Sequence, residues 1–145
     1  ILFRDSSGRM KVKYFYSSKE SLTYPNKDIV MPEPDVSFVL EDSTFNKIKN
    51  AASALGHSEM SIGGNRDVLT LSVADNQNVT SNKFSIDVDG TSKSDNFNFV
   101  INIPNMKILP GDYEVSISSK LISNFKHKEY DLQYWIALEK TSTYE

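Results

Sequence analysis

The side chains that could carry out chemistry in this 145-residue chain include a pair of aspartates in one predicted strand. Asp87 and Asp89 would lie on the same strand face, where two carboxylates could bind a cation or exchange protons. The same spacing is typical of a solvated strand face that enters a turn at Gly90, and the further oxygen ligands of a calcium loop are missing. We favour the solvated face and expect no metal and no cofactor.

The two histidines, His57 and His127, have no second histidine or carboxylate at metal-ligand spacing. We expect both on the surface, one after a helix end and the other in a lysine-rich loop. The chain has no G-x-S-x-G nucleophile elbow, no glycine-rich phosphate loop and no cysteine. None of these patterns supports catalysis, and we predict that the protein is not an enzyme.

The lysines become informative when they are placed on a predicted helix between Asp42–Ser43, a possible cap, and Gly56, a helix end. Its apolar residues recur at spacings of three and four. They are Phe45, Ile48, Ala52 and Leu55. At about 100° per residue, Asn50 lies opposite this face and Lys47 and Lys49 lie on its flanks. The outer face carries no acid, although exposed helices usually mix charges of both signs. The outer face could be a solvated surface or a surface that binds an anion, and this helix alone leaves both interpretations open.

Another lysine lies in a short segment bounded by prolines. Pro104 suits the first position of a helix, and Pro110-Gly111 would end it about one and a half turns later. Met106 and Leu109 would share the inner side, and Lys107 would lie about 160° from Leu109 at 100° per residue. Two short helices with lysines and no acids would form a weak DNA surface without base specificity.

Composition limits the partners of the chain as a whole. It has 16 Lys+Arg against 19 Asp+Glu, a net charge of -3, and 39% hydrophobic residues. This balance should not attract nucleic acid or an anionic membrane in general, so any DNA contact must be local. No apolar run approaches the roughly 18 residues of a membrane helix.

The remaining pattern predicts a sheet protein of the α+β class. Ile1–Arg4 and Arg9–Tyr16 flank a glycine turn and indicate a hairpin, and Ser17–Pro34 indicates an extended connector that holds the main domain boundary. Short apolar runs bounded by turn residues predict the other strands. These runs are Val36–Leu40, Glu59–Ile62, Val68–Ala74, Lys83–Asp89, Asn96–Ile103, Tyr113–Ser119 and Leu132–Glu139.

The order of these elements resembles a known family. The helix "STFNKIKNAASALG", the stretch "DNFNFVINIPNMKILPGDYEVSIS" and the closing strand "YWIALE" are similar to the C-terminal domain of the sliding clamp, the DNA polymerase processivity factor, of T-even-type bacteriophages. The upstream stretch "SSGRMKVKYFYSSKESLTYPNKDIV" resembles the last hairpin of the preceding clamp domain and the interdomain connector. The resemblance implies the processivity fold, with antiparallel sheets and two short helices packed side by side on one face.

The resemblance also implies a domain organisation and an assembly. Residues 1–24 would be the end of an incomplete first clamp domain, 25–34 the connector, and 35–145 a complete C-terminal domain. The family implies a trimeric ring that encircles duplex DNA in the cytoplasm of the infected bacterial host. For this chain we expect self-association as a dimer, because a lone hairpin has unpaired edges.

Site residues follow from the resemblance by position. Non-specific contacts to duplex DNA are expected from Lys47, Lys49, Asn50, Asn105 and Lys107. A pocket for tail peptides of the DNA polymerase and the clamp loader is expected at Val30, Met31, Pro32, Leu109 and Pro110.

A non-enzymatic β-sandwich module of a virion, structural or ligand-binding, is the alternative. In that case both helices would only close the ends of the sheet, and exposed aromatic residues would form a binding platform. Candidates for the platform are Tyr14, Tyr16, Tyr24 and Trp135. Geometry separates the two hypotheses, because a clamp needs both helices side by side, nearly antiparallel, on the same sheet face.

Overall fold

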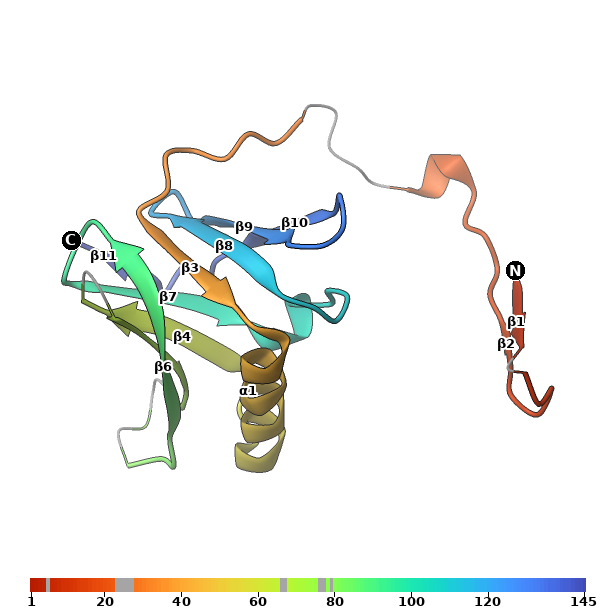
Figure 1. Cartoon of the computed structure of the whole chain (residues 1–145), viewed down its shortest axis with the longest axis horizontal. Coiled ribbons are helices and arrows are strands. Elements are labelled where there is room, and N and C mark those ends of the chain that lie inside the picture. Colours follow the sequence, from red (N-terminus) through yellow and green to blue (C-terminus); the bar gives the residue numbers. More distant parts are fainter. Residues whose placement is uncertain (5, 23–27, 66–67, 76–77, 79) are drawn as a thin grey trace.

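The structure is a computed structural model that describes residues 1–4, 6–22, 28–65, 68–75, 78 and 80–145. Within these residues it comprises a small N-terminal hairpin and a larger sheet with one α-helix (Figure 1). Tyr24 and Pro25, at the predicted start of the connector, lie outside the described residues. In the described part of the chain, no helix has the length and apolar character needed to cross a membrane.

A nine-stranded antiparallel sheet forms the main body, in the order β10-β9-β8-β3-β6-β5-β4-β7-β11. In chain order the strands are β3 (Val36–Leu40), β4 (Glu59–Gly64), β5 (Val68–Val73), β6 (Phe84–Ser92), β7 (Phe97–Asn102), β8 (Tyr113–Ser118), β9 (Ile122–His127), β10 (Gln133–Ala137) and β11 (Thr143–Tyr144). The seven strands predicted for this region are confirmed, with ends that differ by at most three residues. β9 and β11 were not predicted.

β9 is hidden in the sequence because its inward positions are mostly polar. Ser123, Phe125 and His127 are at most 3% exposed, whereas Lys126 between them is exposed. The Ser123 hydroxyl donates to the Ile136 carbonyl at 2.8 Å, which satisfies it inside the protein. The prediction of a surface loop with an exposed His127 is therefore wrong.

The long strand β6 joins the two halves of the sheet at Gly90. Residues 84–89 of β6 pair with β5, and residues 90–92 pair with β3. A Cβ at Gly90 would lie 2.6 Å from Leu69 Cδ1 and 2.8 Å from Phe38 Cβ. Only glycine allows the chain to pass this closely where β6 changes partner.

The helix α1 (Asp42–Leu55) follows β3 and packs against β5 and β6 (Figure 1). Its predicted inner face is confirmed for Phe45, Ile48 and Ala52, which are at most 5% exposed, whereas Leu55 at the helix end is only half-buried. Gly56 ends the helix with a φ of 73°, and the N–H of His57 donates to the Ala52 carbonyl at 3.0 Å.

The second predicted helix is wrong in its extent. Only a 3-10 turn, η2 (Ile103–Asn105), forms, and Met106 leaves the helical region with φ −86° and ψ 56°. Pro104 is compatible with the start of a helix, but Pro110 disfavours a helical conformation at Leu109, so little room is left for further helical turns. Met106 is 5% exposed and Leu109 is 53% exposed, so they do not share an inner face.

Strand β7 is buried on both faces. Phe99 and Ile101 face the core, as their alternation predicts, but Val100 on the opposite face is also only 1% exposed. The C-terminal segment runs beside β7 at this point: the Glu139 N–H donates to the Val100 carbonyl at 2.8 Å, and the Val100 N–H donates to Ser142 Oγ at 2.9 Å.

The N-terminal hairpin forms with shorter strands than predicted, β1 (Leu2–Arg4) and β2 (Lys11–Lys13), and every residue of both is exposed. A short 3-10 turn, η1 (Lys19–Ser21), follows it. Residues 28–34 of the connector contain no helix or strand. The ammonium of Lys93 lies 2.6 Å from a carboxylate oxygen of Glu33 and ties the end of the connector to the loop after β6.

Replacing Gly90 by alanine should destabilise the domain. The added methyl group cannot be accommodated between Leu69 and Phe38 without displacing β3 or β5, and overpacking of this kind costs about 1–3 kcal/mol. Urea unfolding of Gly90→Ala would measure the change. The control is Ser85→Ala on the same strand, where the side chain is exposed. Equal stability of the two variants would contradict the close approach.

Candidate functional site

The outward side of α1 is polar and cationic. Lys47, Lys49 and Asn50 are all exposed, and no acidic residue occurs between Ser43 and Leu55. The ammonium of Lys49 lies 4.6 Å from the centre of the Phe45 ring, within the range of a cation–π contact. This contact fixes one of the two lysine charges close to the helix surface.

The segment from Ile103 to Asp112 carries the other predicted contact residues, and Asn105 and Lys107 are both exposed. The Ile103 N–H donates to the Ser58 carbonyl at 2.8 Å, which anchors the start of the segment beside the chain that leaves α1. No acidic residue occurs between Ile103 and Gly111. Lys107 is therefore a local cation outside any regular element.

The other end of this segment is fastened to the first turn of α1. The Asp42 N–H donates to Asp112 Oδ1 at 2.9 Å, and the Gly111 N–H donates to Asp42 Oδ1 at 3.2 Å. We call this reciprocal pair the Asp42–Asp112 latch. Asp112 satisfies one of the free N–H groups at the helix start and places a carboxylate at the positive end of the helix dipole.

The latch corrects the predicted cap of α1. The N-cap residue is Glu41, whose side chain makes no capping hydrogen bond, and Asp42 is already the first helical residue. The capping carboxylate comes instead from Asp112, 70 positions away in the sequence. A single sequence contains no local signal for a partner at this separation.

Three side chains from the neighbouring strands hold the backbone just before the latch. The Leu109 N–H donates to the Tyr134 hydroxyl at 3.2 Å, and the Tyr113 hydroxyl donates to the Leu109 carbonyl at 2.6 Å. Nε2 of His127 lies 3.3 Å from the Pro110 carbonyl. We call Tyr113, His127 and Tyr134 the aromatic cradle. Sequence reasoning assigned none of them to the site.

Burial raises the pKa of Tyr113 above its ordinary value of 10.0, and the neighbouring Tyr134 and Asp42 raise it further. The hydroxyl consequently stays protonated at neutral pH. It can therefore act as the donor to the Leu109 carbonyl throughout the range in which the protein would work.

The predicted peptide-pocket residues lie on two separate segments. Val30 is 81% exposed, and Met31 and Pro32 are half-buried on the connector, whereas Leu109 and Pro110 are exposed beyond η2. The grooves found at the hairpin, over β3, β6 and β8, at the end of β9 and β10, and beside α1 are lined by other residues.

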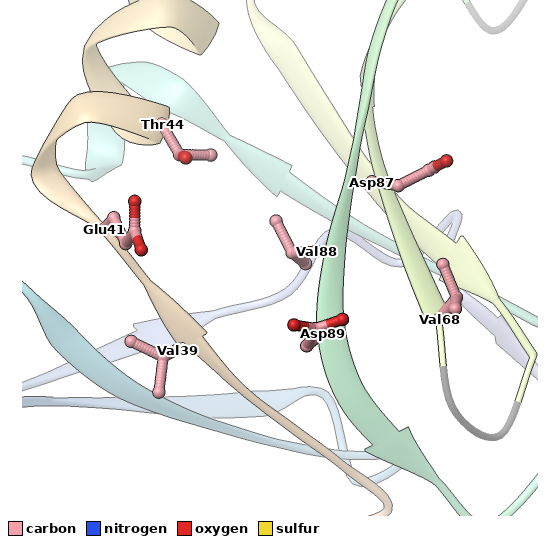
Figure 2. Close-up of a pocket in the computed structure, with 7 residues that line it drawn as sticks. All are labelled: Val39, Glu41, Thr44, Val68, Asp87, Val88 and Asp89. Carbon is pink, nitrogen blue, oxygen red and sulfur yellow. The ribbon is translucent and has the colours of Figure 1, made fainter.

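The groove beside α1 is acidic (Figure 2). It has a volume of about 440 Å³, and its carboxylates come from Glu41 before α1 and from Asp87 and Asp89 on β6. Asp87 and Asp89 are exposed, in agreement with the solvated strand face, and Asp87 accepts a hydrogen bond from Thr70 at 2.7 Å. Among the residues that the structure describes, no three His, Asp or Glu side chains form a group that could hold a metal ion.

This architecture is that of a sliding-clamp domain. The chain superimposes on a DnaN sliding clamp (DNA polymerase III subunit beta) from Pseudomonas aeruginosa bound to griselimycin, with a TM-score of 0.59 and 11% identity, over 83% of this chain and 35% of that one. Caulobacter crescentus pol III beta gives the same TM-score and the same coverage at 13% identity. At such low identities these likenesses show the fold alone.

The sequence comparisons define the family. The family model described as "gp45 sliding clamp, C terminal" matches residues 37–140, and the chain therefore belongs to the gp45 sliding-clamp family. The sliding clamp of Escherichia phage RB69 is 27% identical over 143 residues, which cover 94% of this chain. The chain spans 62% of the length of that relative.

Breaking the latch should lower the stability of α1. Asp112→Ala removes the acceptor of the Asp42 N–H and should cost about 1 kcal/mol, the usual effect of losing a helix cap. Asp112→Asn keeps an acceptor oxygen and should cost less. Urea unfolding measures both, with Glu114→Ala, an exposed acid on β8, as control. Equal losses for the alanine and asparagine variants would refute the cap.

Proposed function

We propose that this chain is the C-terminal part of a DNA polymerase sliding clamp, a non-enzymatic processivity factor that encircles duplex DNA and tethers replication proteins. The latch is the observation that carries the proposal, because it joins the segment of Lys107 to the first turn of the helix that bears Lys47 and Lys49. Membership of the sliding-clamp family supports the same function.

In this proposal α1 and the η2 segment lie side by side and face the DNA. Lys47, Lys49 and Lys107 contact backbone phosphates as point charges, and the amides of Asn50 and Asn105 add neutral donors. None of these contacts distinguishes one base pair from another. Few phosphate contacts also permit sliding, since each position along the duplex is equivalent.

The charge of the rest of the molecule is consistent with a ring that holds DNA in its centre. A closed ring needs little affinity for DNA, so a net charge of -3 does not oppose the function. The acidic groove formed with Glu41, Asp87 and Asp89 would repel phosphates from its face.

Partner proteins would bind through apolar residues of the connector and of the segment after η2. Val30 and Leu109 are exposed and Met31 and Pro32 are half-buried, so each of the two segments offers apolar side chains to a partner. We propose that these residues, with Pro110, take tail peptides of the polymerase and of the clamp loader.

We further propose the domain organisation 1–24, 25–34 and 35–145, in which the hairpin belongs to a preceding clamp domain. The full-length protein would form a trimeric ring in the cytoplasm of the infected bacterial host. The isolated chain would pair through the edges of its hairpin, whose exposed apolar side chains include Leu2, Phe3 and Val12.

The family match counts against the virion-module alternative, although the two-helix test does not separate the hypotheses, because only α1 and a 3-10 turn form in the described residues. Tyr14 and Tyr16 are exposed, but both lie on or next to the hairpin, and Trp135 is half-buried in β10. Tyr24, the fourth member of that platform, is outside the described residues. The family match over residues 37–140 accounts for the sheet without a separate binding module.

Lys47→Ala and Lys107→Ala should each weaken binding to a duplex of about 30 base pairs. Each variant should also lower the slope of log affinity against log salt concentration by about 0.9, the value for one lost phosphate contact. Fluorescence anisotropy with two unrelated duplex sequences measures both effects. The control, Lys140→Ala, removes an exposed lysine near the C-terminus. A control effect of the same size, or a preference for one duplex, would argue against the proposal.

Lys13→Pro should weaken self-association. The Tyr14 N–H donates to the Ile1 carbonyl within the hairpin, so the alternation of an antiparallel pair turns the Lys13 N–H outward, and proline removes it from the free edge. Light scattering at micromolar concentration should show a dimer for the native chain and a monomer for the variant. The control is Ala137→Pro, on the free edge strand β10. If only this variant lost the dimer, the dimer contact would lie at β10 and not at the hairpin.

A further inference from the structure

We propose that the aromatic cradle, Tyr113, His127 and Tyr134, consists of positioning residues that hold Lys107 where it can contact a phosphate. The inference rests on the proposed function, because it assigns to the cradle a role in the contact made by Lys107. Because η2 ends at Asn105, no helix holds the backbone of Lys107, two residues later, and other groups must do so.

The cradle replaces helical hydrogen bonds with side-chain hydrogen bonds. It forms hydrogen bonds with the N–H and the carbonyl of Leu109 and with the carbonyl of Pro110. One side chain from each of the strands β8, β9 and β10 takes part. Lys107 lies two residues before this fastened point and one residue after the buried Met106. Its backbone is thus held on both sides, while its side chain is exposed.

The hydrogen bonds of His127 fix which of its ring nitrogens carries the proton. Nδ1 accepts from the N–H groups of Glu129 at 3.0 Å and Tyr130 at 3.2 Å, so it is unprotonated. Nε2 then carries the hydrogen and donates to the Pro110 carbonyl. A Cβ at Gly111 would overlap Nε2 of His127, so the turn is in direct contact with the ring.

The cradle is rigid enough to position another group. Tyr113 is 1% exposed and His127 is 3% exposed, and their rings meet edge to face with centroids 4.9 Å apart. The Tyr134 ring packs on Tyr113 at 6.1 Å. Holding a lysine in advance reduces the conformational entropy lost when it binds a phosphate.

The first test needs no DNA. In the double variant Tyr113→Phe, Tyr134→Phe both rings remain, but both hydrogen bonds to Leu109 are lost. NMR backbone order parameters at Lys107 and Ile108 should fall from about 0.85, typical of rigid backbone, toward 0.6. Tyr130→Phe is the control, because Tyr130 packs on His127 but its hydroxyl is not part of the cradle. Unchanged order at Lys107 in the double variant would overturn the proposal.

The second test measures coupling in DNA affinity. Lys107→Ala should weaken binding in the native background and change it by less than twofold in the double phenylalanine background. Lys47→Ala should cost the same in both backgrounds, since neither of the two lost hydrogen bonds ends on α1 and the latch between Asp42 and Asp112 remains. An equal cost of Lys107→Ala in both backgrounds overturns the positioning role. If Lys107→Ala has no effect on affinity in the native chain, the proposed DNA surface is wrong. The order parameters would then still show whether the cradle holds the backbone at Lys107.

Two substitutions of His127 separate positioning from simple support of the loop. His127→Gln can keep an N–H near the place of Nε2 and loses the Nδ1 acceptor, whereas His127→Asn keeps an oxygen near Nδ1 and loses the donor to Pro110. The proposal expects the affinity effect of Lys107→Ala to survive in His127→Gln and to vanish in His127→Asn. The opposite result would mean that His127 serves only the loop at Glu129 and Tyr130.

Discussion

The start of α1 leaves backbone N–H groups without partners inside the helix, and the chain satisfies one of them with a carboxylate from a distant turn. This exchange between Asp42 and the Gly111–Asp112 turn determines where the rest of the site lies. The helix with its outward lysines is joined to the segment of Lys107, and that segment is joined through the aromatic cradle to β8, β9 and β10. The need to satisfy an N–H group at the start of α1 therefore links the lysine-bearing helix and segment to the sheet.

The sheet supplies the rigidity that this arrangement needs. β6 changes partner at Gly90, so one continuous sheet can carry α1 against β5 and β6 and the cradle on β8 to β10. The positive and negative side chains around the site also lie on different elements. Lysines lie on the outer side of α1 and on the η2 segment, where residues 43–55 and 103–111 include no acid, whereas the latch carboxylates join the two and the acidic groove lies at Glu41 and along β6. A protein of net negative charge can in this way keep a local cationic face.

Much of the fold was predictable because its elements follow simple periodicities. The inner face of α1, its end at Gly56 and the strands with apolar inward positions are confirmed. The failures have physical reasons as well. β9 has serine and histidine at inward positions, so its alternation does not look apolar. The two prolines of the η2 segment suggested the start and end of a helix, but the chain leaves the helical region at Met106 after one 3-10 turn. The exposure of Lys47, Lys49 and Lys107 agrees with the sequence pattern, whereas their contacts with DNA stay a prediction.

The sequence by itself determined the position of α1 and the lysines on its outer side, because these depend on residue type and on spacings of a few residues. The class of protein followed from the resemblance of longer stretches of the chain to the sliding-clamp family, which the family match confirms. Tertiary structure alone decided that Asp112 caps α1, that His127 is buried with a fixed tautomer, and that Lys107 is held without a helix. The cap of α1 and the hold on the Lys107 segment depend on hydrogen bonds between residues from 17 to 70 positions apart, and the burial of His127 depends on a strand with polar inward residues. The tautomer of His127 is fixed by the nearby N–H groups of Glu129 and Tyr130, which the folded loop turns toward Nδ1. Local periodicity carries no information about such partners, since only the folded chain brings them within hydrogen-bonding distance.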